Sequence, residues 1–189
     1  MFGINVKSYY NRNSYIETDG VASYIDLGFV PTADCSFEIR AKMDDVGTGT
    51  AVYIQSASSG RSVRYSILWD RAGNELRVSA PTVKVSDGED CYNAHTYKYI
   101  AGSLDVDGLK YDVSLTGGVV SLKLGTYYIG GEIYSTKTKF YYAKYYESGV
   151  LIRDLVPYSG PRGVGLLDRV NDVLYTNANS TGTLTYGVE

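Results

Sequence analysis

Apolar and polar residues alternate along much of this chain. The clearest case is the segment 36–43, in which the odd-numbered positions are apolar and the even-numbered positions are polar or charged. The apolar set is Phe37, Ile39, Ala41 and Met43. Because successive side chains of a strand point to opposite faces of a sheet, this period of two predicts a strand with one face in a core and the other in solvent.

A second clear alternation predicts a hairpin over residues 140–156. Positions 141, 143 and 145 are assigned to a mostly apolar face, whereas Tyr142, Lys144 and Tyr146 share the opposite face. A glycine-containing turn at residues 147–149 then reverses the chain into an apolar return strand. The sequence therefore predicts two paired strands with Tyr142 and Tyr146 on the side that carries the lysine.

About a dozen short segments of this kind follow one another at spacings near ten residues. The prolines and glycines between Pro157 and Gly165 predict an irregular corner between two of them. No long segment has apolar residues at the i, i+3, i+4 spacing of a helix. No sequence repeat of about 20 to 50 residues is visible, so a propeller is not predicted. The predicted fold class is all-β, an antiparallel β-sandwich of the jelly-roll type. A length of 189 residues suits one domain, placed at 14–189, with residues 1–13 as an N-terminal arm or added edge strand.

Five segments of the sequence resemble one family. They are Tyr15–Gly20, Tyr24–Pro31, Leu151–Pro157, Gly163–Asp168 and Asn171–Asn177. Together they resemble laminin G-like, concanavalin A-like jelly-roll domains, of the variety found in virion proteins of tailed bacteriophages and in gut-bacterial surface proteins. The resemblance covers roughly residues 15–186 and implies a concanavalin A-like jelly roll.

The resemblance implies a domain that is displayed on a particle or cell surface and adheres to glycans. The expected protein is a non-enzymatic bacteriophage virion structural or accessory protein, associated with the capsid or the tail, whose lectin-like jelly roll adheres to host surface glycans. The alternative is a soluble carbohydrate-binding, lectin-type domain of a bacterial surface protein. The expected partners are other virion proteins or copies of the same chain, together with a host-surface glycan. The expected location is the virion, after synthesis in the host cytoplasm, or alternatively the bacterial cell surface as part of a larger assembly.

Charge and hydropathy argue against two classes of partner. The net charge is −3, the pI is near 5.2, and no basic run exceeds two residues, so nucleic acid is not an expected partner. No apolar run approaches the ~18 residues that a membrane span needs, and no secretory signal is visible, so neither membrane insertion nor export is expected. In a chain that is not exported, Cys35 and Cys91 are expected to be reduced, although they could pair.

The sequence contains no residue set that predicts catalysis. His95 is the single histidine; it lacks the spacing of a zinc site and no Gly-x-Ser-x-Gly elbow accompanies it, so a surface position at a strand end is expected. A retaining glucanase would typically use Glu-x-Asp-x-x-Glu, but the nearest match, Glu17–Ala22, has alanine in place of the second glutamate. The chain is therefore predicted not to be an enzyme.

Calcium is the one cofactor left open, because the laminin G-like domains that the chain resembles often bind it at the sandwich rim. The main candidate ligands are Asp87, Glu89 and Asp90 in one acidic loop. Other oxygen-rich loops contain Asp44 with Asp45 and Asp105 with Asp107. The last pair also fits a simple hairpin turn, since aspartate and glycine are what such turns require.

Exposed aromatic side chains are the remaining candidate site. The chain has 20 tyrosines, and an aromatic face can stack on a sugar ring while polar groups fix its orientation. The candidate glycan-stacking residues are Trp69, Tyr92, Tyr142 and Tyr146. Core packing is the competing interpretation for Trp69, and coverage of a sheet face or a subunit contact is the competing interpretation for Tyr142 and Tyr146.

Overall fold

A computed structural model describes residues 11, 13–45, 50–57, 63–70, 75–78, 83–85, 92–100, 102–118, 120–129 and 132–189. Every regular element in these ranges is a β-strand, and paired strands run antiparallel. The described part of the chain holds no helix long and apolar enough to cross a membrane. The predicted all-β, antiparallel sandwich of the concanavalin A-like type is confirmed.

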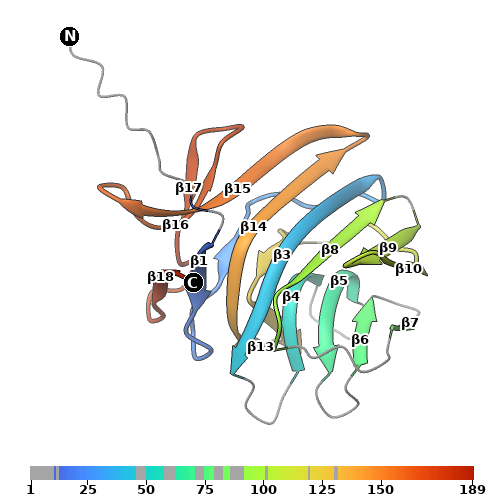
Figure 1. The fold of residues 1–189 in the computed structure, drawn as a ribbon, viewed down its shortest axis with the longest axis horizontal. Coiled ribbons are helices and arrows are strands. Elements are labelled where there is room, and N and C mark those ends of the chain that lie inside the picture. Colours follow the sequence, from blue (N-terminus) through green and yellow to red (C-terminus); the bar gives the residue numbers. More distant parts are fainter. Residues whose placement is uncertain are drawn as a thin grey trace.

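The larger sheet contains ten strands and is seen nearly face-on in Figure 1. Its main path, in spatial order, is β10 (Leu109–Asp112), β9 (Ser103–Val106), β8 (His95–Ile100), β3 (Cys35–Asp45), β14 (Lys137–Glu147), β15 (Val150–Gly160), β16 (Gly163–Asp168) and β17 (Val173–Tyr175). Off this path, β1 (Ser14–Thr18) pairs with β14 and with β18 (Leu184–Val188).

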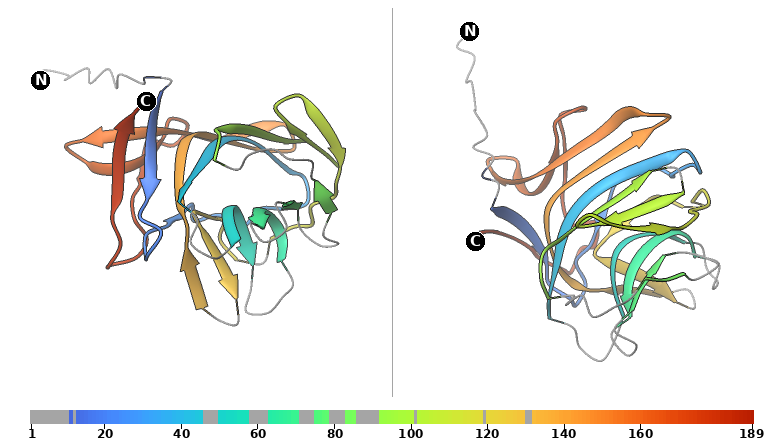
Figure 2. Two further views of the ribbon diagram at one scale, coloured as in Figure 1. Left: turned by 60° about the horizontal axis from the view of Figure 1, so that its bottom comes forward. Right: turned by 45° about the vertical axis from the view of Figure 1, so that its right-hand side comes forward.

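A smaller sheet of six strands forms the second layer of the sandwich, and Figure 2 shows it beneath the larger sheet. In spatial order its strands are β2 (Ile25–Asp26), β11 (Lys123–Leu124), β4 (Thr50–Ala57), β5 (Val63–Asp70), β6 (Glu75–Val78) and β7 (Val83–Val85). A separate hairpin joins β12 (Thr126–Ile129) to β13 (Glu132–Ser135).

The core lies between the two sheets, on the faces that the alternation predicted. The four apolar residues of β3 between positions 37 and 43 are at most 1% exposed. Phe37 packs edge-on against Tyr65 of the smaller sheet, with ring centroids 5.9 Å apart, and also contacts Tyr145 of β14. Full burial of such a side chain contributes about 1.5–3 kcal/mol, so this contact between the sheets is one of the interactions that hold the sandwich together.

A β-bulge interrupts the alternation in β14. Phe140 pairs with Ala41 and Tyr142 pairs with Arg40, so Tyr141 is an extra residue with no partner on β3. A bulge of this kind turns two successive side chains toward the same face. The prediction that Tyr141 faces the core is therefore wrong, because the bulge shifts the period of two by one residue and places Tyr141 beside Tyr142 on the outer face.

The bulge coincides with a fork in the larger sheet. One edge of β14 pairs with β3, but the other edge has two partners, β1 opposite Lys139 and Phe140 and β15 from Ala143 onward. Between these two partners neither β1 nor β15 pairs with Tyr141 or Tyr142. Figure 1 shows β15 and β1 diverging from β14 at this place.

The prediction of an irregular corner between Pro157 and Gly165 is wrong, because these residues form a regular hairpin. β15 continues to Gly160 and β16 begins at Gly163, and Pro157 pairs with Leu166 within this hairpin. Beyond Leu155, β15 has left β14 and only β16 remains as its partner. A proline without an N–H is tolerated there because proline is accepted in strands that have an unpaired edge.

Candidate functional site

A hollow lies on the outer face of the larger sheet, over the fork. Its volume is about 660 Å³. Polar, charged and aromatic side chains from β3, β14 and β15, and from residues just before β1, after β16 and after β18, surround it. The lining residues are Asn13, Glu38, Arg40, Tyr141, Tyr142, Lys144, Asp154, Val156, Arg169 and Glu189.

Tyr142 is a half-buried aromatic side chain in this hollow. Its hydroxyl donates a hydrogen bond of 2.9 Å to Oε1 of Glu38, and the ammonium of Lys144 lies 5.8 Å from its ring centroid. Burial, together with this bond and the charge of Glu38, raises the pKa of Tyr142 to about 12. The ring is thus held in one orientation by its neighbours on β3 and β14.

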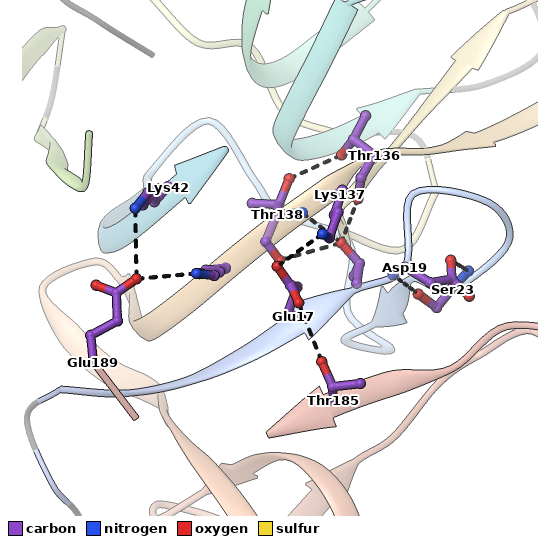
Figure 3. Close-up of polar contacts among 11 residues, drawn as sticks. Glu17, Asp19, Ser23, Lys42, Thr136, Lys137, Thr138, Thr185 and Glu189 are labelled. Carbon is purple, nitrogen blue, oxygen red and sulfur yellow. Dashed lines mark hydrogen bonds and ion pairs between the residues drawn. The ribbon is translucent and has the colours of Figure 1, made fainter. Parts of the chain in front are cut away.

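Tyr141 binds Glu189, the residue after β18, at the fork. Its hydroxyl donates a 2.8 Å hydrogen bond to Oε2 of Glu189. The other carboxylate oxygen of Glu189 lies 3.1 Å from the ammonium of Lys139 and 3.7 Å from that of Lys42, the contact visible in Figure 3. Partial burial would raise the pKa of Glu189, but the hydrogen bonds from Tyr141 and Lys139 and the two lysine charges lower it overall.

The lining of the hollow also contains an ion pair between Asp154 of β15 and Arg169. Arg169 Nη2 lies 2.6 Å from Oδ2 of Asp154, and its Nε donates a 2.9 Å hydrogen bond to the same oxygen. Arg40, from β3, also lines the hollow, with its guanidinium carbon 5.5 Å from the ring centroid of Tyr141. Charged groups therefore surround the aromatic residues at the fork.

Two further hollows continue from the first across the same sheet. The second, of about 280 Å³, shares Glu38 with the first and contains the half-buried Tyr146. The third, of about 320 Å³, shares Lys98 and Ile100 with the second. Because neighbouring hollows share lining residues, they form one interrupted groove that crosses the strands from β10 to β15.

Charges alternate in sign along this groove. Cross-strand register places Lys110 opposite Asp105, Asp105 opposite Lys98, Lys98 opposite Glu38, Glu38 opposite Lys144, and Lys144 opposite Asp154. The row lines the groove with polar groups of both signs.

The structure brings together two of the four predicted aromatic residues. Tyr142 and Tyr146 lie on the outer face of β14, as the alternation predicted, and line hollows that share Glu38. Tyr92 lies elsewhere, 40% exposed in the turn before β8. Trp69 is in β5 of the smaller sheet, and its side chain is outside the described residues. Whether any of the four binds a ligand stays a prediction.

Two residues of the site were missed by sequence reasoning. Tyr141 was assigned to the wrong face, and no local signal identified the bulge. Glu189 is distant in sequence from the strands it contacts, so only the pairing of β18 with β1 brings it to the fork. The polar face of β3, in contrast, was read correctly, and it supplies Glu38 and Arg40.

The main calcium candidates, Asp87, Glu89 and Asp90, lie outside the described residues. Within the described ranges, no group of three or more metal-ligating side chains occurs. Asp105 and Asp107 form the predicted turn instead. Oδ1 of Asp105 accepts the Gly108 N–H at 2.7 Å, and Asp107 adopts a φ of +50°.

His95 opens β8 but is not a surface residue as predicted, since it is 7% exposed. The β9–β10 turn places Asp107 against it, with Nδ1 of His95 at 2.7 Å from Oδ2 of Asp107. Cys35 begins β3, is buried and forms no disulfide; Cys91 lies outside the described residues. His95 and Cys35 are thus both buried, and His95 contacts a turn residue.

The glucanase-like segment 17–22 has a structural role at Asp19. Oδ1 of Asp19 accepts the backbone N–H groups of Val21, Ala22 and Ser23, each at 2.9 Å, and Oδ2 accepts that of Thr183 at 2.8 Å. In return, the Asp19 N–H donates to the hydroxyl of Ser23, as Figure 3 shows. The carboxylate therefore joins the β1–β2 loop to the chain before β18.

Comparison with known proteins identifies the fold alone. No protein-family model matches the sequence, and no curated protein is similar to it. Among solved structures, a candidate carbohydrate-binding protein from Bacteroides ovatus aligns over 93% of this chain with a TM-score of 0.62 and 10% identity. This chain spans 60% of the length of that protein. At such low identity the likeness shows that the two share a fold.

A sialidase from Trypanosoma rangeli is a more distant neighbour. Its complex with sialic acid aligns over 67% of this chain and 26% of the sialidase, with a TM-score of 0.47 and 13% identity. A second complex of the same enzyme covers 74% of this chain and 29% of the sialidase at the same TM-score of 0.47 and 12% identity. Similarity at this level carries no argument about fold or function.

Proposed function

We propose that this chain is a non-enzymatic carbohydrate-binding domain that recognises glycans on the outer face of its larger sheet. The observation that carries the proposal is the hollow of about 660 Å³ at the fork, with the half-buried ring of Tyr142 held by Glu38. The shared fold with a candidate carbohydrate-binding protein supports it.

The chemistry of the groove suits sugars. A sugar ring presents C–H groups on its faces and hydroxyl groups around its rim, so a binding site needs aromatic surfaces together with hydrogen-bonding groups. Tyr142 and Tyr146 supply the aromatic surfaces on one strand. Glu38, Lys98 and Lys144 lie beside them as hydrogen-bonding groups, in hollows that share residues.

The proposal excludes glycoside hydrolysis because the carboxylates have other partners. Asp19 accepts four backbone N–H groups, and Asp154 pairs with Arg169. A glycosidase needs one carboxylic acid able to donate a proton and a second carboxylate as nucleophile or base. Incubation with any glycan that the protein binds should release no reducing ends; hydrolysis that disappears in Glu38→Gln or Asp154→Asn would contradict this part of the proposal.

The biological setting remains the prediction made from the family resemblance. A virion protein of a tailed bacteriophage would display the groove in many copies, and a bacterial surface protein would present it as one domain of a larger assembly. Both settings are compatible with a domain that binds glycans. Mass spectrometry of purified phage particles distinguishes the two settings, because it should detect this chain only if it is a virion protein.

The direct test is binding of the purified protein to an array of bacterial surface glycans. Tyr142→Ala and Tyr146→Ala should each lower the affinity for a bound glycan by about tenfold or more, as expected for a central aromatic contact. Tyr186→Ala, which removes a tyrosine 37% exposed on β18, is the matched control and should bind normally. Unchanged binding by both groove variants, with their fold verified by circular dichroism, would refute the proposed site.

A further inference from the structure

The hollow at the fork is lined by charged side chains of both signs. Its cations are Arg40, Lys144 and Arg169, and its carboxylates are Glu38, Asp154 and Glu189. The lining thus holds three cations and three carboxylates. Lys42 and Lys139, outside the lining, pair with Glu189.

The carboxylates of the hollow already have donors. Asp154 is paired with Arg169. Glu189 accepts hydrogen bonds from Tyr141 and Lys139, and Lys42 forms an ion pair with it. Glu38 accepts the hydroxyl of Tyr142. Each carboxylate thus has a donor within the protein, although Oδ1 of Asp154 accepts no hydrogen bond from the described residues, and a ligand that brought only hydroxyl donors would share these carboxylates with the protein's own donors.

Of the described cations that line the hollow, Arg40 and Lys144 are the two that form no ion pair with its carboxylates. Arg40 is exposed and Lys144 is half-buried. In the described part of the chain neither lies within ion-pair distance of a carboxylate, and each contacts a tyrosine ring instead, Arg40 that of Tyr141 and Lys144 that of Tyr142. Their N–H groups are therefore the donors of the hollow that are available to a ligand.

We propose that the glycan bound at the fork is acidic, with a carboxylate or sulfate group that accepts hydrogen bonds from Arg40 and Lys144. This inference rests on the proposed function and specifies its ligand class. A guanidinium can bind such a group through two parallel hydrogen bonds, and charge-assisted bonds are roughly twice as strong as neutral ones. Tyr142, which pairs with Arg40 in register and has the Lys144 ammonium 5.8 Å from its ring centroid, would stack on the sugar ring that carries the acidic group.

The test compares matched acidic and neutral saccharides. Hexagalacturonate and its fully methyl-esterified form differ in the charge of the carboxyl groups and in the methyl groups that mask it, and sulfated and unsulfated dextran hexasaccharides differ in sulfation, the unsulfated form being neutral. The probes also include the acidic saccharides of the bacterial array, each with its neutral derivative. At least one acidic member should bind about tenfold or more tightly than its neutral counterpart, and its affinity should fall as salt is added. The pair that shows the preference distinguishes carboxylate from sulfate.

Two variants locate the preference. Arg40→Gln and Lys144→Gln should each reduce binding of the acidic member by about tenfold and leave the neutral member unchanged. Arg162→Gln, which removes a cation in the turn between β15 and β16 with the same change in net charge, is the matched control and should behave as the unmodified protein. Arg40 is exposed and Lys144 is half-buried on the outer face of the sheet, outside the core, so the variants should fold.

The outcomes separate this inference from the proposed function. Neutral saccharides bound as tightly as their acidic forms, with Arg40→Gln and Lys144→Gln indistinguishable from Arg162→Gln, would overturn the acidic-ligand inference and leave glycan binding intact. Absence of binding to every saccharide, acidic or neutral, would overturn both.

Discussion

Tyr141 and Tyr142 are neighbours in sequence and yet lie on the same face of β14, where both line the hollow at the fork. In a regular strand one of them would point into the core. The bulge lets Tyr141 hold Glu189 while Tyr142 is held by Glu38. One inserted residue thus joins the segment after β18 to β14 and places two tyrosines at the candidate site.

Replacing Tyr141 with phenylalanine removes the hydroxyl that binds Glu189 and keeps the ring. A hydrogen bond to a charged group contributes about 1.5–3 kcal/mol, so the free energy of unfolding of Tyr141→Phe should fall by about that amount in urea denaturation. Tyr186→Phe, at an exposed position of β18, serves as the control. Equal stability of the two variants would show that the bond to Glu189 contributes nothing.

Alkaline pH should destabilise the protein through its buried tyrosines. Burial is the main cause that raises the pKa of Tyr142 to about 12 and that of Tyr65 and Tyr145 well above the usual value. A raised pKa in the folded state means that the stabilising contribution is complete below the unfolded value near 10 and is lost as the pH rises from about 10 toward 12. Absorbance of tyrosinate, followed together with circular dichroism, should show these tyrosines ionising only at or above this range and with loss of structure. A full tyrosinate signal near pH 10 in folded protein would be inconsistent with this account.

Asp19 should be important for stability and for its acid dependence. Partial burial alone would raise the pKa of Asp19, but the backbone hydrogen bonds from Ser23, Ala22, Thr183 and Val21 hold it well below its ordinary value. A lowered pKa stabilises the folded state above the unfolded value near 4, and this contribution is lost as the pH falls below that value. Asp19→Ala should lower the free energy of unfolding at neutral pH by about 2 kcal/mol.

The difference between Asp19→Ala and the unmodified protein should shrink in denaturation experiments at acidic pH, where the native carboxylate also begins to protonate. A pH-independent difference would mean that the loop is stabilised by packing and not by the charge of Asp19.

The length of a bound glycan should matter, because the three hollows form one groove. The path from β10 to β15 crosses five inter-strand spacings, about 24 Å at about 4.8 Å each. In titration calorimetry, affinity should therefore rise from a disaccharide to a hexasaccharide, and Tyr146→Ala in the second hollow should weaken the longer chain more than the shorter one. Equal affinities for both lengths would restrict the site to the hollow at the fork.

Gly165 should not accept a side chain. A Cβ built on Gly165 would lie 2.1 Å from the carbonyl oxygen of Tyr175 on β17, so Gly165→Ala must separate two paired strands and should cost about 3 kcal/mol of unfolding free energy. Gly149→Ala provides the comparison, since its Cβ would meet no atom within 4 Å and only the φ of +79° is unfavourable, which costs about 1 kcal/mol. A smaller loss for Gly165→Ala than for Gly149→Ala in urea denaturation would contradict the close approach.

The sequence by itself determined the β-sandwich and most of its buried faces. The period of two is a local property of extended backbone, so Ile39 and Ala41 could be assigned to the core, and Tyr142 and Tyr146 to the outer face, without knowledge of any partner strand. The turn at Asp107 and Gly108 was equally readable, because positive φ angles select these residue types.

Only the tertiary structure decided where β14 is bulged and forked and which residues meet there. A bulge is defined by register against a partner, and Tyr141 becomes an extra residue only because Phe140 and Tyr142 pair with the adjacent residues Ala41 and Arg40 of β3. Glu189 reaches Tyr141 because β18 pairs with β1. Such long-range pairings depend on the free energy of the whole sheet and leave no periodic trace in the local sequence, so the fold was predictable and the hollow at the fork was not.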